Sequence, residues 1–433
     1  MIPTMKTMKT IRGLVTELII LLFIGLGADA AELSCASSTT LDELVTCVRN
    51  QMPASGSEGF VIPSVTEQAD WRSVVRQLLD GSCNISLPAS LTGIMQIRAF
   101  TDSANGRTYC VFMEVLDANN DGKVDRGWGT FIVDPNAVRE LSHQAPHPIA
   151  DSTTENQAVG VFKGTQSRSF LMAGSHRNAD TATSPCQNAY LVADAAHNVA
   201  NMFQPTTEEL AAHYGAFPWN AIQWHGMAAD TCTNVDVYLS HGRNQVPAAG
   251  DKIVELKNNL LAYRPSWKLQ TPGTGACSLN ATDNVQGRLL NGVAAGAVCG
   301  TVAAGYTGTF LHIEQDPGFR NPADWIVAVN DTWPATPPPL PPAAPGILMA
   351  SAVSKSQINL AWADHSDNES GFQIERSTDG SLFTPIATVG VNVTGIANTG
   401  LKANKTYWYR VRAFNAVGSS AYSNVAGATT LRR

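Results

Sequence analysis

Eight of the nine histidines in this chain lie between His143 and His312. His147 and Asp151 stand four residues apart, a spacing at which a turn or the first turn of a helix can aim both side chains at one cation. Neutral imidazole and carboxylate together suit a catalytic zinc ion, which keeps an open coordination position. The pair therefore predicts a metal site. In the alternative interpretation, Asp151 or Ser152 simply caps a helix.

Other histidines could complete this site. His225 ends a short apolar run and precedes Gly226, which permits close backbone approach, so we predict a third ligand there. It could instead be a hydrogen-bonded core histidine. His176 is a further candidate ligand, although it could position a substrate oxygen. His197 is a reserve that could simply pair with Asp194.

Two downstream segments add groups for catalysis. Arg288 follows Asn284 within one turn and could grip a substrate carboxylate in a forked geometry, with help from Arg177. His312 and Glu314 would share one face of a strand because side chains alternate. A glutamate beside a metal site is the ordinary general base for amide hydrolysis, so Glu314 is the predicted base. A surface ion pair with Arg320 is the alternative.

The segment from residue 117 to residue 125 predicts a separate structural calcium site. Its oxygen ligands stand at the first, third, fifth and ninth positions of a calcium loop, and glycine stands at the sixth. The ligands would be Asp117, Asn119, Asp121 and Asp125. Trp128 replaces the glutamate of position twelve, and a β-hairpin tip is an equally good interpretation.

Composition and missing motifs exclude several classes of function. The formal net charge is -7 and the pI is near 5.7, which opposes binding to nucleic acid because a phosphate backbone demands a clustered basic face. The chain contains no nucleophile-elbow serine motif, no phosphate-binding glycine loop and no His-Glu-x-x-His helix. Serine hydrolase and nucleotide chemistry both lose support.

Apolar periodicity indicates how these residues are positioned. Short apolar runs typical of strands alternate with stretches of helical spacing, which predicts an α/β domain with a mixed sheet over residues 31–333. The predicted strands cover residues 168–174, 221–225, 235–239 and 309–314, and the predicted helices cover 41–48, 71–79, 157–162, 197–203 and 252–263. Ligands gather at the carboxyl ends of strands in such sheets. We expect His176, His225, His241 and Glu314 there.

Both the cysteines and the N-terminus predict an exported protein. The cysteines are even in number, eight in all, which predicts disulfides in an oxidising compartment. Of roughly a hundred pairings, bonds between sequential neighbours are the simplest guess. Residues 1–30 combine early basic residues, an apolar run and a small-x-small site, and they predict a cleaved signal peptide. The mature protein is expected in the periplasm or outside the cell, with no membrane attachment.

A proline-rich stretch at residues 334–345 predicts a stiff linker before a second domain at residues 346–431. Beyond it, residues 357–362, 371–376 and 407–413 alternate apolar and polar side chains. With Trp362 as a core tryptophan and Leu401 plus Tyr407 as a corner, this part resembles a fibronectin type III domain. The resemblance implies an all-β, immunoglobulin-like sandwich that acts as a spacer or contacts a cell surface or polysaccharide.

The order of candidate residues from His147 to Glu314 resembles zinc carboxypeptidases and related N-formylglutamate amidohydrolases and poly-gamma-glutamate hydrolases. The resemblance implies that His147 and His225 bind zinc, Arg288 holds a substrate carboxylate and Glu314 is the base. Two departures are an aspartate, Asp151, where a glutamate is expected, and the separation of Asn284 from Arg288.

The sequence thus predicts a secreted, metal-dependent hydrolase that cleaves an amide or peptide bond in an anionic peptide or acyl-amino acid. A noncatalytic binding or adhesion protein and a metal-dependent phosphoesterase are the alternatives.

Overall fold

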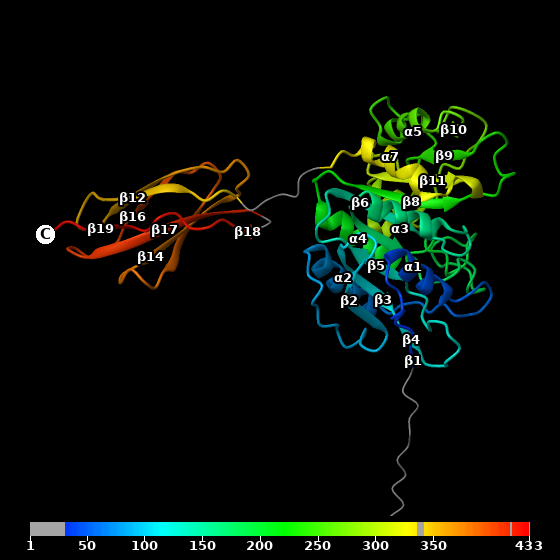
Figure 1. Ribbon diagram of the computed structural model, residues 1–433, viewed down its shortest axis with the longest axis horizontal. Coiled ribbons are helices and arrows are strands. Elements are labelled where there is room, and N and C mark those ends of the chain that lie inside the picture. The colour runs from blue at the N-terminus through cyan, green and yellow to red at the C-terminus, as the bar shows by residue number, and fades with distance from the viewer. Residues whose placement is uncertain (1–30, 336–341, 416–417, 433) are drawn as a thin grey trace, which may run out of the picture. The chain divides into compact units, whose positions relative to one another are not determined.

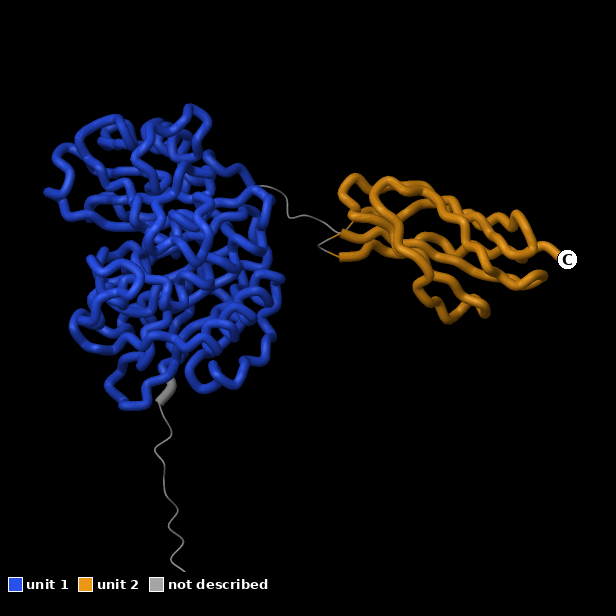
Figure 2. Tube along the Cα trace, turned by 180° about the vertical axis from the view of Figure 1, so that it is seen from behind, with its two compact units in different colours: residues 1–335 blue, residues 336–433 orange. Residues whose placement is uncertain are grey.

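The computed structural model describes residues 31–335, 342–415 and 418–432. The chain divides into two compact units, Met1–Ala335 and Thr336–Arg433 (Figures 1 and 2). The fold-class prediction is confirmed, because an α/β unit with a mixed sheet is followed by an all-β sandwich. The predicted signal peptide and residues 336–341 of the predicted linker lie outside the described residues.

A nine-stranded sheet organises the N-terminal unit, in the order β10-β9-β11-β8-β6-β7-β5-β3-β2. The strands are β2 (Met95–Thr101), β3 (Thr108–Glu114), β5 (Thr130–Val133), β6 (Arg139–Ala145), β7 (Ser167–Met172), β8 (Asn220–Gly226), β9 (Val237–Ser240), β10 (Leu269–Gln270) and β11 (Phe310–Gln315). A separate antiparallel pair joins β1 (Ala31–Glu32) to β4 (Leu116–Asp117). Strands β7, β6, β8 and β11 run parallel, so their carboxyl ends meet at one edge, whereas β9 runs antiparallel to β11.

Helices cover both faces of this sheet (Figure 1). They are α1 (Leu41–Asn50), α2 (Val65–Leu79), α3 (Thr154–Gly164), α4 (Phe203–Tyr214), α5 (Lys252–Tyr263), α6 (Val285–Leu290) and α7 (Pro322–Thr332), with short 3-10 turns at Ala295–Ala297 and Pro317–Phe319. One core joins Trp224 and Ile313 of the sheet to α1, α3, α5 and α7. The other joins Phe112 and Phe310 to α2, α4 and α6.

The helix predicted at residues 197–203 is wrong, because that segment forms turns and α4 begins only at Phe203. Two asparagine side chains explain the difference. Asn198 Nδ2 donates to the carbonyl oxygen of Val192, and Asn201 Oδ1 accepts from the backbone N–H of Gln204. Such side-chain bonds to the backbone compete with a continuous helix and favour its start instead.

All eight cysteines form disulfides. Cys35–Cys47 and Cys83–Cys110 join sequential neighbours as guessed, but the other two bonds are nested. Cys186 pairs with Cys299 across 113 residues, and this bond encloses Cys232–Cys277. The simplest guess failed there because the order of strands in the sheet, and not the order of the sequence, decides which loops become neighbours.

The C-terminal unit is a sandwich of two sheets, β12-β13-β16 and β15-β14-β17-β18, with β19 paired to β17. Its strands are β12 (Gly346–Ala352), β13 (Ile358–Ala363), β14 (Gly371–Ser377), β15 (Thr384–Val389), β16 (Gly395–Asn398), β17 (Thr406–Asn415), β18 (Gly418–Ser419) and β19 (Ala426–Thr429). Trp362 and Leu401 lie in the core, and the Tyr407 hydroxyl accepts from the backbone N–H of Lys402 at 3.1 Å. These residues form the core tryptophan and corner that the sequence resemblance implied.

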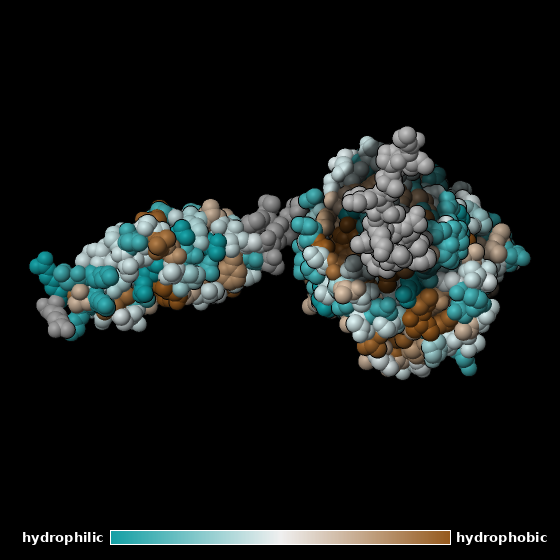
Figure 3. Space-filling model, turned by 90° about the horizontal axis from the view of Figure 1, so that it is seen from below, coloured by the Kyte–Doolittle hydropathy of each residue, from teal (hydrophilic) through white to brown (hydrophobic). Residues whose placement is uncertain are grey.

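The surface of the C-terminal unit mixes hydrophilic and hydrophobic residues on the side visible in Figure 3. Ile347 and Met349 on β12 are mostly exposed, at 73% and 59%. Within the described parts of the chain, every helix is too short or too polar to cross a membrane.

Candidate metal centre

The candidate residues converge at the edge where the parallel strands end. In the β8–β11 register His225 lies opposite Glu314, and Gln223 lies opposite His312. Side chains two residues apart share a face of a strand, so these four point to the face that Phe310 shares with α4 and α6. The turn after β6 brings His147 and Asp151 to the same edge.

Two ring nitrogens meet at one carboxylate oxygen. His147 Nδ1 lies 3.2 Å and His225 Nδ1 3.4 Å from Asp151 Oδ2. The potential ligand atoms of these three residues all lie within 4.8 Å of one another. All three residues are buried. Ile149 and Thr153 adopt φ values of 69°, which lets the chain turn tightly enough to present both His147 and Asp151.

Arg320 and Gly226 lock this turn to the sheet. Arg320 donates to the carbonyl oxygens of Ser152, Met227 and Gln315. A Cβ atom at Gly226 would lie 2.4 Å from the Arg320 guanidinium carbon, so a side chain there would push the guanidinium away from these carbonyl oxygens. Arg320 is therefore committed to backbone carbonyls, and Glu314 pairs with His312 instead.

Outer partners fix the orientation of both imidazoles. His147 Nε2 donates to Asp194 Oδ1 at 2.9 Å, and His225 Nε2 donates to Gln223 Oε1 at 3.3 Å. Asn284 Nδ2 holds that same amide oxygen at 2.7 Å. A donor bond at Nε2 leaves Nδ1 to face the cavity, which is the arrangement that metal-binding histidines use.

The two imidazoles differ in proton affinity. Burial opposes the charged form of His147, but Asp194 and Asp151 outweigh it and raise its pKa to about 9. Burial and the neighbouring His312 lower the pKa of His225 to about 4. The difference arises because Asp194 contacts only the first of these rings.

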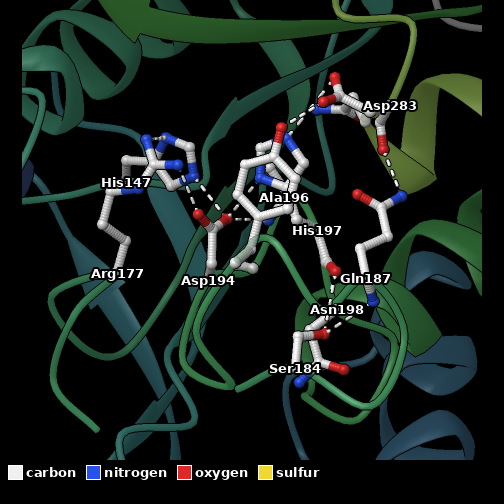
Figure 4. A network of polar contacts seen from close by, with 12 residues as sticks. His147, Arg177, Ser184, Gln187, Asp194, Ala196, His197, Asn198 and Asp283 are labelled. Carbon is white, nitrogen blue, oxygen red and sulfur yellow. Dashed lines mark hydrogen bonds and ion pairs between the residues drawn. The ribbon is translucent and has the colours of Figure 1, made fainter. Parts of the chain in front are cut away.

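Asp194 joins the side chains of His147, His197 and Arg177 (Figure 4). Its Oδ1 accepts from His147, from His197 Nδ1 at 2.9 Å and from the backbone N–H of Ala196, and its Oδ2 pairs with Arg177 NH2 at 2.5 Å. Arg177 NH1 also lies 3.2 Å from His147 Nδ1. These contacts hold the pKa of Asp194 well below its usual value despite burial.

His312 and Glu314 stand beside the three ligands. His312 Nε2 lies 3.4 Å from Glu314 Oε1, and with His225 they form another compact group of potential ligand atoms. Burial alone would raise the pKa of Glu314, but His312 and His225 lower it. Glu314 is thus an ionised carboxylate within the site.

A cavity of about 410 Å³ unites these groups. It is lined by His147, Asp151, Arg177, Tyr190, His197, His225, Gly226, residues 278–284, His312 and Glu314. A larger concavity of about 670 Å³ lies along α1. We assign no chemistry to that one because no histidine or arginine lines it.

Three predicted residues lie elsewhere. Arg288 is absent from the cavity lining, and its guanidinium donates to the carbonyl oxygens of Thr282, Val298 and Cys299. His176 accepts from the backbone N–H of Asn178 and joins none of the compact ligand groups of the described residues. His241 lies at the opposite edge of the sheet, because β9 runs antiparallel to β11.

The segment predicted to bind calcium forms the loop between the antiparallel strands β3 and β5. Its carboxylates accept backbone N–H groups of the same loop: Asp117 from Asp121 and Gly122, Asp121 from Lys123, and Asp125 from Ala118. Among the described residues its three aspartates do not form a compact ligand group. The hairpin-tip interpretation accounts for these bonds, and Asn119 joins them by accepting from Asp121 N–H.

Sequence reasoning missed Tyr190 and Asp283, which both line the cavity. Each lies in irregular backbone outside the apolar patterns. Asp194 was considered only as a partner of His197, since nothing in its spacing reveals that it also holds His147.

Comparison with known proteins identifies the C-terminal part. Residues 343–429 match the fibronectin type III domain family. An α-amylase from Niallia circulans is 35% identical over 100 residues, which are 22% of this chain and 7% of the amylase, so the chain spans a small fraction of that relative.

Solved structures give matches of similar extent. A β-1,2-glucanase from Parabacteroides distasonis is 26% identical over 23% of this chain and 15% of its own, with a TM-score of 0.20. An Fn3-like protein from Clostridium thermocellum is 30% identical over 20% of this chain and 90% of its own, with a TM-score of 0.18. Together with the sandwich topology and the Tyr407 corner, the family match shows that residues 343–429 form a fibronectin type III domain.

Proposed function

We propose that the N-terminal unit is a metal-dependent hydrolase that cleaves an amide or peptide bond outside the cytoplasm. One observation carries the proposal: the ligand atoms of His147, Asp151 and His225 lie within 4.8 Å of one another, and Glu314 lines the same cavity. This combination supplies both a cation site and a base.

The donor set fits zinc. Two imidazole nitrogens and one carboxylate oxygen are the number and kinds of protein ligands found in catalytic zinc sites. Asp194 and Gln223 supply the outer hydrogen bonds that such imidazoles need. Bound zinc would supply a Lewis acid that polarises a carbonyl and lowers the pKa of water.

The surrounding side chains have matching roles in this proposal. Glu314, ionised and held by His312, accepts a proton from the attacking water and returns it to the leaving nitrogen. Arg177 reaches the cavity while tied to Asp194, and its remaining N–H groups can donate to the carbonyl oxygen as negative charge develops there.

The disulfides and the second domain support the proposed location outside the cytoplasm. Four disulfides favour a compartment outside the cytoplasm. The fibronectin type III domain would act as a spacer or contact a cell surface or polysaccharide. The expected preference for anionic substrates now depends on Arg177, because Arg288 does not line the cavity and its Nε and NH1 donate to backbone carbonyls.

Metal analysis of the disulfide-bonded protein tests the site. We expect about one zinc ion per chain, and Asp151→Asn should lower zinc affinity by about tenfold or more while keeping the shape of the side chain. His147→Ala should do the same. His143→Gln is the matched control, because His143 is equally buried but contacts Ser167 and Trp224 away from the cavity.

Activity on small substrates separates the alternatives. Zinc-dependent release of amine from acyl-amino acids or short peptides would support the proposal. Cleavage of a phosphodiester but no amide would indicate a phosphoesterase. Absence of stoichiometric zinc, with His147→Ala as stable as the parent, would favour a noncatalytic binding protein.

A further inference from the structure

One wall of the cavity has no part in the catalytic scheme. It consists of Tyr190, His197 and Asp283. Figure 4 shows His197 and Asp283 close to each other. Asp283 is the only one of the three with a carboxylate, and its side chain is 44% exposed. A substrate entering the cavity would therefore meet a negative charge there.

Asp283 is held rigidly. The Tyr190 hydroxyl donates to Asp283 Oδ2, and the Tyr190 ring stacks on His197 with centroids 3.6 Å apart and planes 4° apart. Gln187 Nε2 donates to the Asp283 carbonyl oxygen at 2.7 Å, next to the Cys186–Cys299 disulfide. A group fixed by its side chain and its backbone loses little entropy when a ligand binds.

The basic side chains near Asp283 pair mainly with a different carboxylate. His147, His197 and Arg177 all share one other carboxylate, Asp194. His197 Nε2 lies 3.8 Å from Asp283 Oδ1, which is beyond hydrogen-bond distance. Contacts with His197 and Tyr190 keep the pKa of Asp283 below its usual value, so the group is an anion at neutral pH.

Among the described residues that line this cavity there is no lysine, and the arginine, Arg177, pairs with Asp194 and not with Asp283. The 3.8 Å contact with His197 leaves room at Asp283 Oδ1 for a closer donor. A primary ammonium group is the chemistry that complements a fixed carboxylate oxygen, since it supplies charge and several donors in a small volume.

We propose that Asp283, held by Tyr190 and facing His197, binds a positively charged amino group of the substrate. The inference deepens the proposed function, because it concerns substrate recognition in the same cavity. Asp283 is a specificity-determining residue that selects an amine-bearing peptide or acyl-amino acid, from a side chain or a free N-terminus.

Calorimetric binding of three matched probes tests this. N-acetyl-Ala-Lys-amide carries a side-chain amine, Ala-norleucine-amide carries an N-terminal amine, and N-acetyl-Ala-norleucine-amide carries neither. We expect one amine probe to bind the parent about tenfold tighter than the neutral probe, the size of a partly exposed charge-assisted hydrogen bond. Whichever amine probe binds more tightly shows whether the cavity recognises a side-chain amine or an N-terminal amine.

Two variants test whether Asp283 and Tyr190 cause this preference for an amine. Asp283→Asn keeps the shape and the bond to Tyr190, and it should reduce the amine preference to less than about threefold. Tyr190→Phe should lose part of the preference, because the ring stays stacked while the hydroxyl that anchors Asp283 is gone. Equal binding of neutral probe by the parent and Asp283→Asn would show that the cavity is intact.

Failure of this proposal is distinguishable from failure of the proposed function. Equal binding of all three probes by the parent, or an unchanged preference in Asp283→Asn, would overturn the role of Asp283. Zinc content measured on the same samples reports on the metal site independently. If the protein prefers the amine probes but contains no zinc, the result would support amine recognition by Asp283 and contradict the proposed hydrolase.

Discussion

The two units treat buried charge in opposite ways. The C-terminal sandwich is filled by apolar and aromatic side chains, and its buried Glu375 is satisfied by Arg410 and the Tyr422 hydroxyl. The N-terminal unit instead buries several histidines and carboxylates against one another at a sheet edge. Burying charge costs free energy that hydrophobic packing avoids. A fold that retains such a network at a cavity is a better candidate for chemistry than one that keeps its core apolar.

The same contrast holds between two histidines of the N-terminal unit. His143 and His147 are both fully buried, but among the described residues His143 contacts Ser167 and Trp224 and no carboxylate, and burial lowers its pKa to about 3. His147 contacts Asp194 and Asp151, which raise its pKa to about 9. Burial alone thus does not mark the site. Contact with a carboxylate does, because Asp151 lies beside both His147 and His225.

Replacing the proposed base should have the largest effect on activity. Glu314→Gln keeps the shape of the side chain but removes the proton acceptor, so kcat should fall by about 10²- to 10⁴-fold. Zinc content should stay at the level of the parent. The measurement is kcat on an amide substrate together with metal analysis.

Glu375→Gln in the C-terminal unit is the matched control, because it removes a buried carboxylate far from the proposed chemistry along the chain. It should leave kcat unchanged while lowering the free energy of unfolding of that unit. An active Glu314→Gln variant would transfer the role of base to another group.

Local patterns explain what the sequence could predict. Strand alternation identified the sandwich, and short-range spacing identified His147 with Asp151 in one turn and His312 with Glu314 on one strand. The structure also brings His225 and Arg177 to the cavity. Arg288 was misplaced because a sequence shows which donors a side chain has, but not the carbonyl groups that a loop folds around it. The contacts of Asp194 with His147 and of Asp283 with Tyr190 join residues far apart in the sequence, and no local period encodes them.

Zinc binding should be linked to pH through His147. Because its pKa is about 9, this imidazole carries a proton at pH 7 that must leave before Nδ1 can bind zinc. Binding should therefore release about one proton at pH 7 and progressively less as the pH rises through about 9. Calorimetry in buffers of different ionisation enthalpy measures this number.

In the metal-free protein, the raised pKa of His147 should make the free energy of unfolding depend on pH. A pKa raised above the ordinary 6.5 means that His147 stabilises the fold fully below pH 6.5, and that this contribution is lost as the pH rises through about 9. Asp194→Asn should lower both the proton release and the pH dependence, since it removes the largest charge that raises the pKa. Identical proton release in the parent and Asp194→Asn would contradict this role.

Separating the two units should have the smallest effect on catalysis. The described sandwich has its own core, and the candidate site draws all its residues from the N-terminal unit. A protein that ends at Ala335 should therefore keep kcat on a short amide within about twofold, because a self-contained domain folds without its neighbour. Binding to insoluble polysaccharide or cells should be measured on the same pair, since a surface-contacting module would be needed there and not for turnover. A large loss of kcat on the short amide would show that the sandwich supports the site itself, and the division between an apolar module and a chemical one would fail.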